Sequence, residues 1–273
     1  MLFWILLLLA SLQGIIEWLP VSSEGQIIIV SNLLNIDSDS ALDLALWLHL
    51  GTLIAVSIKY YKDIYLYFNP KISDPIIVKW RWFLLLSTIG TIIVGVLCYI
   101  LVRYVTIDPA IGEYVMLIVG IALLITAGLL FYAKRQQKTG KKIEDLSKKE
   151  MTSIGLLQGF SIIPGISRSG ITLSGLLFMS VDKDEAIKGS FIMSIPAVMG
   201  GFILNLLDKL IKNENIFPAD WWMIIIAIIV TAVLGYLTME LFIRIARKYN
   251  FAAICVVLGL LTIILFALRW LPS

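Results

Sequence analysis

The chain has 273 residues, of which 59% are hydrophobic and only 15% are charged. Soluble domains carry about 25% charged residues, so a chain this apolar could not cover a soluble surface, and a large soluble core is excluded. The formal net charge of +3 is small and its basic residues fall in loops, which speaks against a nucleic-acid partner.

Long apolar runs separated by short charged loops predict an all-α polytopic membrane protein surrounded by membrane lipids. Each run has roughly the 20 residues that a helix needs to cross the hydrocarbon layer. Six full transmembrane helices are predicted, at about Ala41–Lys59, Trp82–Val102, Tyr114–Ala133, Ala186–Leu206, Trp221–Ile243 and Phe251–Leu271. The apolar N-terminal stretch Met1–Ala10 has no basic region before it, so we interpret it as a membrane-embedded helix rather than a signal peptide.

Two polar segments, Gln13–Gln26 and Gln158–Thr172, interrupt this apolar pattern. Pro20 in the first, and Pro164 and Gly165 in the second, prevent either segment from forming one straight helix. Unpaired backbone is tolerated at membrane depth only where it is buried in protein or lines a wet cavity. We therefore expect two re-entrant helix–loop–helix segments, each entering and leaving the membrane on one side.

The chain also repeats itself, since Leu12-Gln13-Gly14 recurs as Leu157-Gln158-Gly159 at an offset of 145 residues. The same offset relates Ser22 to Ser167, Gly25 to Gly170 and Ala41 to Ala186, and an offset of 140 relates Thr91 to Thr231 and Gly95 to Gly235. These matches predict a single membrane domain made of a first half (1–134), a basic loop (135–150) and a second half (151–273).

Each predicted half contains three full spans, an odd number, so the second half must enter the membrane from the opposite side. In such inverted repeats the site usually lies near the midplane, where broken helices of the two halves meet. The loop 134–150 is rich in lysine and arginine, which predicts that it is cytoplasmic. Alternation then places both termini outside, although the outer loop 208–220 still carries Lys209 and Lys212.

Three ionisable residues fall within the two polar segments: Glu17, Glu24 and Arg168. A charge inside a membrane costs at least a few kcal/mol, so by default it marks a functional site with a partner. The alternative is a buried ion pair between Glu17 and Arg168 that only holds the halves together. Gln13 shares a helix face with Glu17, four residues away, whereas Glu24 would equally suit a water-facing loop tip.

The second polar segment has the chemistry of an oxyanion site. Ser167, Ser169 and Thr172 supply hydroxyl donors around Arg168, and arginine pairs with phosphate oxygens through two parallel hydrogen bonds. A helix beginning near Ser169 would add free N–H groups and the positive end of its dipole. A Ser-Arg-Ser loop alone is a weak signal, but it is stronger opposite a Gln/Glu helix and a Ser-Ser loop.

These residues resemble the undecaprenyl-diphosphatase family of membrane phosphatases. That family carries an (E/Q)xxxE motif followed by a Pro-Val-Ser-Ser loop, and a second motif, PGxSRSxxT. Here they stand as Gln13-xxx-Glu17, Pro20-Val21-Ser22-Ser23 and Pro164-Gly165-Ile166-Ser167-Arg168-Ser169-Gly170-Ile171-Thr172. The resemblance covers essentially the whole chain, and the second motif is the specific one.

The resemblance implies hydrolysis of a polyprenyl diphosphate to the monophosphate in the cell membrane, which recycles a lipid carrier and underlies bacitracin resistance. It also implies a divalent metal, Mg²⁺ or Ca²⁺, and a site that opens toward the outer face. Glu17 would bind the metal or act in acid–base chemistry with Gln13 beside it, and Ser23 or Ser22 would be the nucleophile or a phosphate ligand. The diphosphate would be held by Arg168 with Ser167, Ser169, Thr172 and Gly165.

One position departs from the family pattern. Bacterial members usually have histidine where this chain has Gln26, and the only histidine here is His49, near a position where those relatives tend to carry glutamine. We hypothesise that the two side chains have exchanged places, so that His49 faces the same site. A histidine satisfied within the protein core is the equally weighted alternative.

Other readings stay open at the level of sequence. A polyprenyl-phosphate transporter or flippase could use the same inverted repeat, whereas a non-catalytic scaffold would leave Glu17 and Arg168 unexplained. The attacking group could be a serine or a metal-activated water. The sequence likewise does not decide between a monomer and a homodimer.

Overall fold

The computed structural model describes residues 3–36, 38–106, 114–136, 140–163, 165–248 and 251–268. In these ranges the regular structure is helical, apart from one isolated bridge between Lys141 and Val181. The all-α prediction is therefore confirmed. Pro164 and parts of the loop 134–150 lie outside the described residues.

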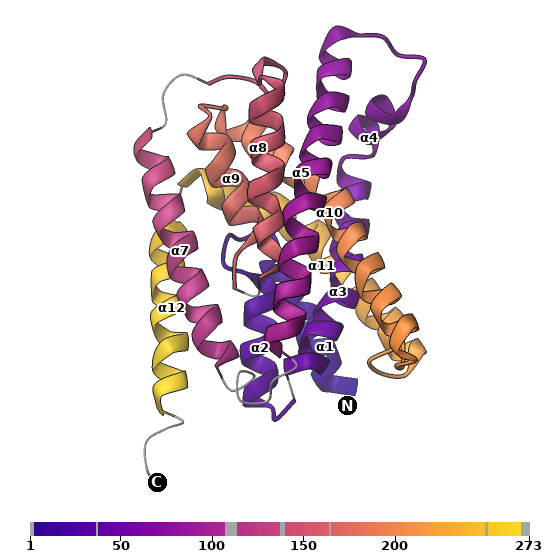
Figure 1. Cartoon of the computed structure of the whole chain (residues 1–273), viewed down its shortest axis with the longest axis vertical. Coiled ribbons are helices and arrows are strands. Elements are labelled where there is room, and N and C mark those ends of the chain that lie inside the picture. Colours follow the sequence, from indigo (N-terminus) through magenta and orange to yellow (C-terminus); the bar gives the residue numbers. More distant parts are fainter. Residues whose placement is uncertain are drawn as a thin grey trace.

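The helices follow one another with short connections (Figure 1). They are α1 (Phe3–Ile16), α2 (Ser23–Leu33), α3 (Ser38–Lys59), α4 (Tyr61–Phe68), α5 (Pro75–Thr106), α7 (Val115–Gln136), α8 (Lys148–Gly159), α9 (Arg168–Phe178), α10 (Lys183–Lys212), α11 (Trp221–Lys248) and α12 (Phe251–Leu268). Single 3-10 turns, Ile143–Asp145 and Phe160–Ile162, precede and follow α8.

Four helices in the described part of the chain, α3, α5, α10 and α11, are long and apolar enough to cross a membrane. Helices α7 and α12 occupy the other two predicted span positions, with apolar stretches at Leu117–Tyr132 and Ala252–Ala267. Large apolar side chains such as Leu97, Ile211 and Leu237 are exposed on the outside of the bundle. An outer surface of this kind suits lipid rather than water, as expected for a polytopic membrane protein.

Each polar segment forms two helices joined by a turn, α1 with α2 and α8 with α9. Figure 1 shows α1 and α2 in the lower part of the molecule and α8 and α9 in the upper part. Helix α4 also lies at the upper end, whereas α1 begins and α12 ends at the lower end. This arrangement is the one that two oppositely inserted re-entrant segments require.

The two halves are joined by matched contacts that follow the repeat. Thr231 on α11 donates a 3.0 Å hydrogen bond to the carbonyl of Ala10 on α1, and Thr91 on α5 donates one of 3.2 Å to the carbonyl of Gly155 on α8. The two donors are related by the offset of 140 residues, and the two acceptors by the offset of 145. Each re-entrant helix thus packs on a long helix of the other half, which supports the inverted repeat.

Candidate active site

Helix α1 delivers the first pair of site residues. Gln13 is fully buried, and its Nε2 donates a 2.6 Å hydrogen bond to Oε2 of Glu17. The backbone N–H of Glu17 still bonds the carbonyl of Gln13 at 3.1 Å, so the helical spacing places both side chains on one face. The Glu17 side chain is 2% exposed, and a buried carboxylate needs partners that compensate its charge.

The Ser-Ser turn between α1 and α2 gives its two hydroxyls different environments. Ser22 has a left-handed backbone (φ 57°) and caps α2, its Oγ accepting a 3.2 Å hydrogen bond from the N–H of Gly25. Ser23 instead donates a 2.5 Å hydrogen bond to Oε2 of Glu17. Of the two serines, Ser23 therefore has the geometry of a hydroxyl paired with a base.

The second half repeats the capping hydrogen bond of this turn, although Ser167 has an extended backbone (φ −69°) where Ser22 is left-handed. Ser167 caps α9, and its Oγ accepts a 3.2 Å hydrogen bond from the N–H of Gly170, as Ser22 does from Gly25. Arg168, the first residue of α9, pairs through Nη2 with Oε1 of Glu17. The two broken segments therefore meet directly, as the inverted repeat predicts.

His49 reaches the same carboxylate from α3. Its Nε2 lies 3.4 Å from Oε2 of Glu17, and its Nδ1 lies 2.6 Å from the carbonyl oxygen of Ala45. The Gln26 side chain instead donates a 3.3 Å hydrogen bond from Nε2 to the carbonyl of Val21. His49 thus lies where the exchange hypothesis requires it, while its part in the reaction stays a prediction.

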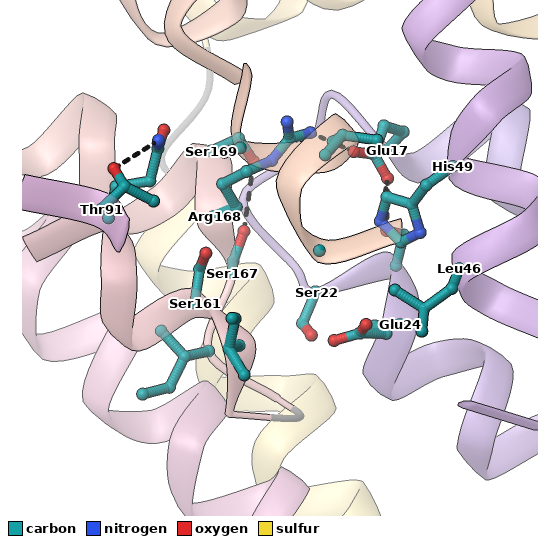
Figure 2. Close-up of a pocket in the computed structure, with 17 residues that line it drawn as sticks. Glu17, Ser22, Glu24, Leu46, His49, Thr91, Ser161, Ser167, Arg168 and Ser169 are labelled. Atoms are coloured by element: carbon teal, nitrogen blue, oxygen red, sulfur yellow. Dashed lines mark hydrogen bonds and ion pairs between the residues drawn. The ribbon is translucent and has the colours of Figure 1, made fainter. Parts of the chain in front are cut away.

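Most of these side chains, though neither Gln13 nor Gln26, line one pocket that contains about 720 Å³ of empty space, part of it open to the exterior. Figure 2 shows Glu17, His49 and Arg168 pointing toward one another, with Ser167 and Ser169 beside the arginine. The polar lining includes Glu17, Ser22, Ser23, Glu24, Ser167 and Arg168, and these side chains come from both halves of the chain. The predicted meeting of the two polar segments therefore produces a hollow that could admit a head group.

Two predicted phosphate ligands lie behind this pocket rather than in its lining. The Thr172 hydroxyl is 2.7 Å from the carbonyl of Arg168 and 2.6 Å from the Ser190 hydroxyl, and its side chain is fully buried. Gly165 has φ +96° and packs against Val119, where a side chain would collide with backbone. Neither residue is among those that line the pocket, and their predicted contacts with the diphosphate stay predictions.

Sequence reasoning missed several residues that do line the pocket. Glu24, which the sequence left open, faces it, and so do Ser161, Gln158 and Thr91. Gln158 donates a 3.0 Å hydrogen bond to the Thr91 hydroxyl. The repeat carried a signal for Gln158, because it is the counterpart of Gln13, whereas nothing local in the sequence singles out Ser161.

The site retains hydrogen-bonding groups that its own residues do not use. Within the described ranges, Arg168 Nη1 and Gln13 Oε1 are buried atoms without a hydrogen-bond partner. An unpaired buried donor on a guanidinium is costly, and it is suited to an incoming anion. The Arg168 guanidinium thus pairs with Glu17 through Nη2, and its buried Nη1 is a donor that a bound phosphate oxygen would satisfy.

A divalent metal can be tested against the same residues. The described part of the chain has no group of three or more His, Cys, Asp or Glu side chains placed to hold a metal ion by themselves. Mg²⁺ commonly needs only one or two carboxylates, completed by substrate phosphates and water. Glu17 and Glu24 both line the pocket, and Gln13 has its free Oε1 nearby. The donor set fits a metal that arrives with, or is completed by, a phosphorylated ligand.

The chain matches the family model of the bacitracin resistance protein BacA over residues 6–261. It is 36% identical over 266 residues to the undecaprenyl-diphosphatase of Methanothrix thermoacetophila, with 96% of each chain covered. It is 35% identical to that of Methanopyrus kandleri, over 94% of this chain and 93% of the relative, and 34% identical to that of Oceanobacillus iheyensis, over 96% and 97%. This chain therefore belongs to the family of the bacitracin resistance protein BacA.

Proposed function

We propose that this protein hydrolyses a polyprenyl diphosphate of the undecaprenyl type to the monophosphate, and so recycles a lipid carrier in the cell membrane. The relatives are named for this activity. The single observation that carries the proposal is the state of Arg168, which pairs with Glu17 through Nη2 and keeps Nη1 unpartnered in a serine-lined pocket. That arrangement suits a phosphate head group held close to the Glu17 carboxyl group.

Binding of the diphosphate uses Arg168 and the start of α9. The guanidinium supplies a fixed positive charge, and the N-terminal turn of the helix adds the positive end of its dipole. Ser167 and Ser169 line the pocket on either side of Arg168. Charge that builds on the transferred phosphoryl group is offset by these groups, and such electrostatic positioning dominates phosphoryl transfer.

Ser23 is the group we assign as the nucleophile. Its hydroxyl proton passes to Glu17, to which it is hydrogen-bonded at 2.5 Å, while Oγ attacks the terminal phosphorus. The phosphoanhydride bond breaks, the lipid monophosphate leaves with the bridging oxygen, and water then hydrolyses the phosphoserine. His49, whose Nε2 lies 3.4 Å from the same carboxylate, orients Glu17.

Direct attack by water is the competing route. Trapping a phosphoserine at Ser23 would establish the covalent path, and its absence under conditions that should accumulate it would favour water. If a divalent metal takes part, Glu17 and Glu24 would hold it with Gln13 in support, and it would neutralise charge on the phosphates.

The decisive experiment supplies the purified protein with undecaprenyl diphosphate and Mg²⁺ or Ca²⁺, with and without a chelator, and measures released phosphate. We expect metal-dependent release that the chelator abolishes. A protein that moves a labelled polyprenyl phosphate across liposomes but releases no phosphate would instead be a flippase. Phosphate release that continues unchanged in the presence of the chelator would show that the reaction needs no divalent metal.

We also propose that residues 134–150 face the cytoplasm and that both termini lie outside. The described part of the basic loop, from Gly140, leads into α8 at the same end as α4, opposite the start of α1 and the end of α12 (Figure 1). A cysteine introduced at Lys142 should resist a membrane-impermeant thiol reagent added to intact cells, and it should react once the cells are opened. Reaction in intact cells would reverse the orientation.

A further inference from the structure

An apolar groove continues from the polar pocket along the outside of the bundle. It lies between α5 and α10 and encloses about 670 Å³ of empty space. Four residues line both spaces, namely Thr91, Ile162, Ala197 and Gly201. A ligand could therefore occupy the pocket and the groove at the same time.

The groove is apolar and reaches the surface that faces lipid. Ile92 on α5 and Ile203 on α10 line it and are 56% and 48% exposed. Gly200 also lines it, and a Cβ placed there would meet no atom within 4 Å. The groove is therefore open at this point partly because residue 200 is a glycine and has no side chain.

The inverted repeat shows that this opening is not general to the fold. Pro196 and Thr91, which line the groove, correspond through the two offsets to Gly51 on α3 and Thr231 on α11. There the helices touch: a Cβ added to Gly51 would lie only 2.6 Å from Cβ of Thr231. The counterpart of the groove is closed by direct helix contact.

A second pair of counterparts shows the same difference. Gly95 and Gly200 both line the groove, and they correspond to Gly235 and Ala55. A Cβ added to Gly235 would lie 3.4 Å from Cβ of Ala55, at ordinary contact distance. The two halves thus share one plan, and the described residues leave it open on the α5–α10 side and closed on the α3–α11 side.

We infer that the groove between α5 and α10 binds the isoprenoid chain next to the diphosphate and is the lateral entrance by which the lipid substrate reaches the pocket. This inference rests on the proposed function. A polyprenyl diphosphate joins a doubly charged head to an apolar chain, so its site must join a polar pocket to an apolar space that opens into the bilayer. The shared residues on α10, Ala197 and Gly201, lie at that junction.

The first test fills the groove with Gly200→Leu and uses Gly128→Leu as the matched control. Gly128 lies on α7, outside both spaces, and a Cβ there also meets no atom within 4 Å. With farnesyl diphosphate we expect Gly200→Leu to raise KM about tenfold with kcat unchanged, because displacing about two methylene groups from an apolar contact costs that factor. Gly128→Leu should change neither constant. An unchanged KM in Gly200→Leu, or a loss confined to kcat, would overturn the inference.

The second test does not depend on turnover. A farnesyl diphosphate analogue with a photoreactive group on its chain is cross-linked to the wild-type protein, and the labelled peptides are mapped by mass spectrometry. Labels should fall within 88–96 of α5 or 196–204 of α10, and undecaprenyl phosphate should compete for them whereas a diacyl phospholipid should not. Labelling on α3 and α11, or equal competition by the phospholipid, would contradict the inference. A wild type that labels correctly but releases no phosphate would refute the proposed function alone.

Discussion

The Ser23 hydroxyl and the Arg168 guanidinium bind opposite oxygens of one carboxylate, that of Glu17. Ser23 donates to Oε2 at 2.5 Å, and Arg168 pairs with Oε1. Arg168 is 151 positions from Glu17 in the chain, and it arrives from the other half of the repeat. The Glu17 carboxylate therefore holds the proposed nucleophile, Ser23, next to the proposed phosphate-binding group, Arg168.

Substitutions of the two adjacent serines should differ in their effects on activity and stability. Ser23→Ala removes the hydroxyl that is bonded to Glu17, so we expect phosphate release to fall by at least about a hundredfold, with little change in thermal stability. Ser22→Ala removes the cap of α2, which costs about 1 kcal/mol of stability, and should keep most of the activity. Phosphate release and thermal unfolding in detergent measure both effects. Equal activity losses in the two variants would reject Ser23 as the nucleophile.

Arg168→Ala should lose activity while still folding. It removes a preorganised donor to the developing phosphoryl charge, an effect worth about 10²–10³ in kcat for a comparable donor. The Glu17 carboxylate loses its strongest partner but keeps Gln13, Ser23 and His49, so the protein should unfold at a lower temperature without failing to assemble. Arg244→Ala, at an exposed side chain, is the control. An Arg168→Ala protein with full activity would contradict the assignment of Arg168 to the active site.

The exchange of Gln26 and His49 predicts a rescue. His49→Gln should reduce phosphate release about tenfold or more, since it removes the imidazole that orients Glu17, and misplacing a catalytic group can cost about 10²-fold. Adding Gln26→His to that variant should restore part of the activity, because Gln26 lies on α2, one turn beyond Ser22 and Ser23. Gln26→His alone is the control. Full activity in His49→Ala would show instead that the histidine is only a satisfied core residue.

Helices α3 and α10 are joined by a buried ion pair that should matter for stability. Lys209 Nζ lies 2.5 Å from Asp43 Oδ2, with side chains 7% and 19% exposed. Asp43→Asn would leave the lysine charge uncompensated, which typically costs about 3–5 kcal/mol, and should lower the unfolding temperature markedly. Asp208→Asn breaks a more exposed i,i+4 pair with Lys212 and should cost only about 0.3–0.5 kcal/mol. Similar decreases in the unfolding temperature of the two variants, measured in detergent, would contradict the larger contribution of the buried pair.

Much of the architecture could be predicted from the sequence because the bilayer imposes it. Length and hydropathy locate the spans around α3, α5, α10 and α11, since only uninterrupted apolar helices can cross hydrocarbon. Prolines and glycines at the two polar segments predict the breaks between α1 and α2 and between α8 and α9. The offsets of 145 and 140 residues predict two related halves, and the structure relates the contact of Thr231 with Ala10 to that of Thr91 with Gly155 by the same offsets.

Only some residues of the candidate active site could be identified from the sequence. Glu17 and Arg168 are conspicuous in the sequence because an ionised group in an apolar setting needs a partner, and the structure pairs them. The approach of His49 to Glu17 was only a hypothesis, since it depends on how α3 rotates against α1. The PGxSRSxxT pattern does not reveal which of its members line the pocket: Ser167, Arg168 and Ser169 do, whereas Thr172 contacts Ser190 and Gly165 packs against Val119.

The sequence by itself determined a membrane-spanning inverted repeat with two polar breaks, because span length, proline, glycine and charge act locally. Only the tertiary structure decided which side chains contact the Glu17 carboxylate. It also decided that a groove opens between α5 and α10 and not between α3 and α11. Gly51 lies directly against Thr231 of α11, whereas Pro196 and Gly200 line the open groove between α10 and α5. That difference depends on the approach of helices distant in the chain, and packing distances between helices are not encoded in hydropathy or spacing.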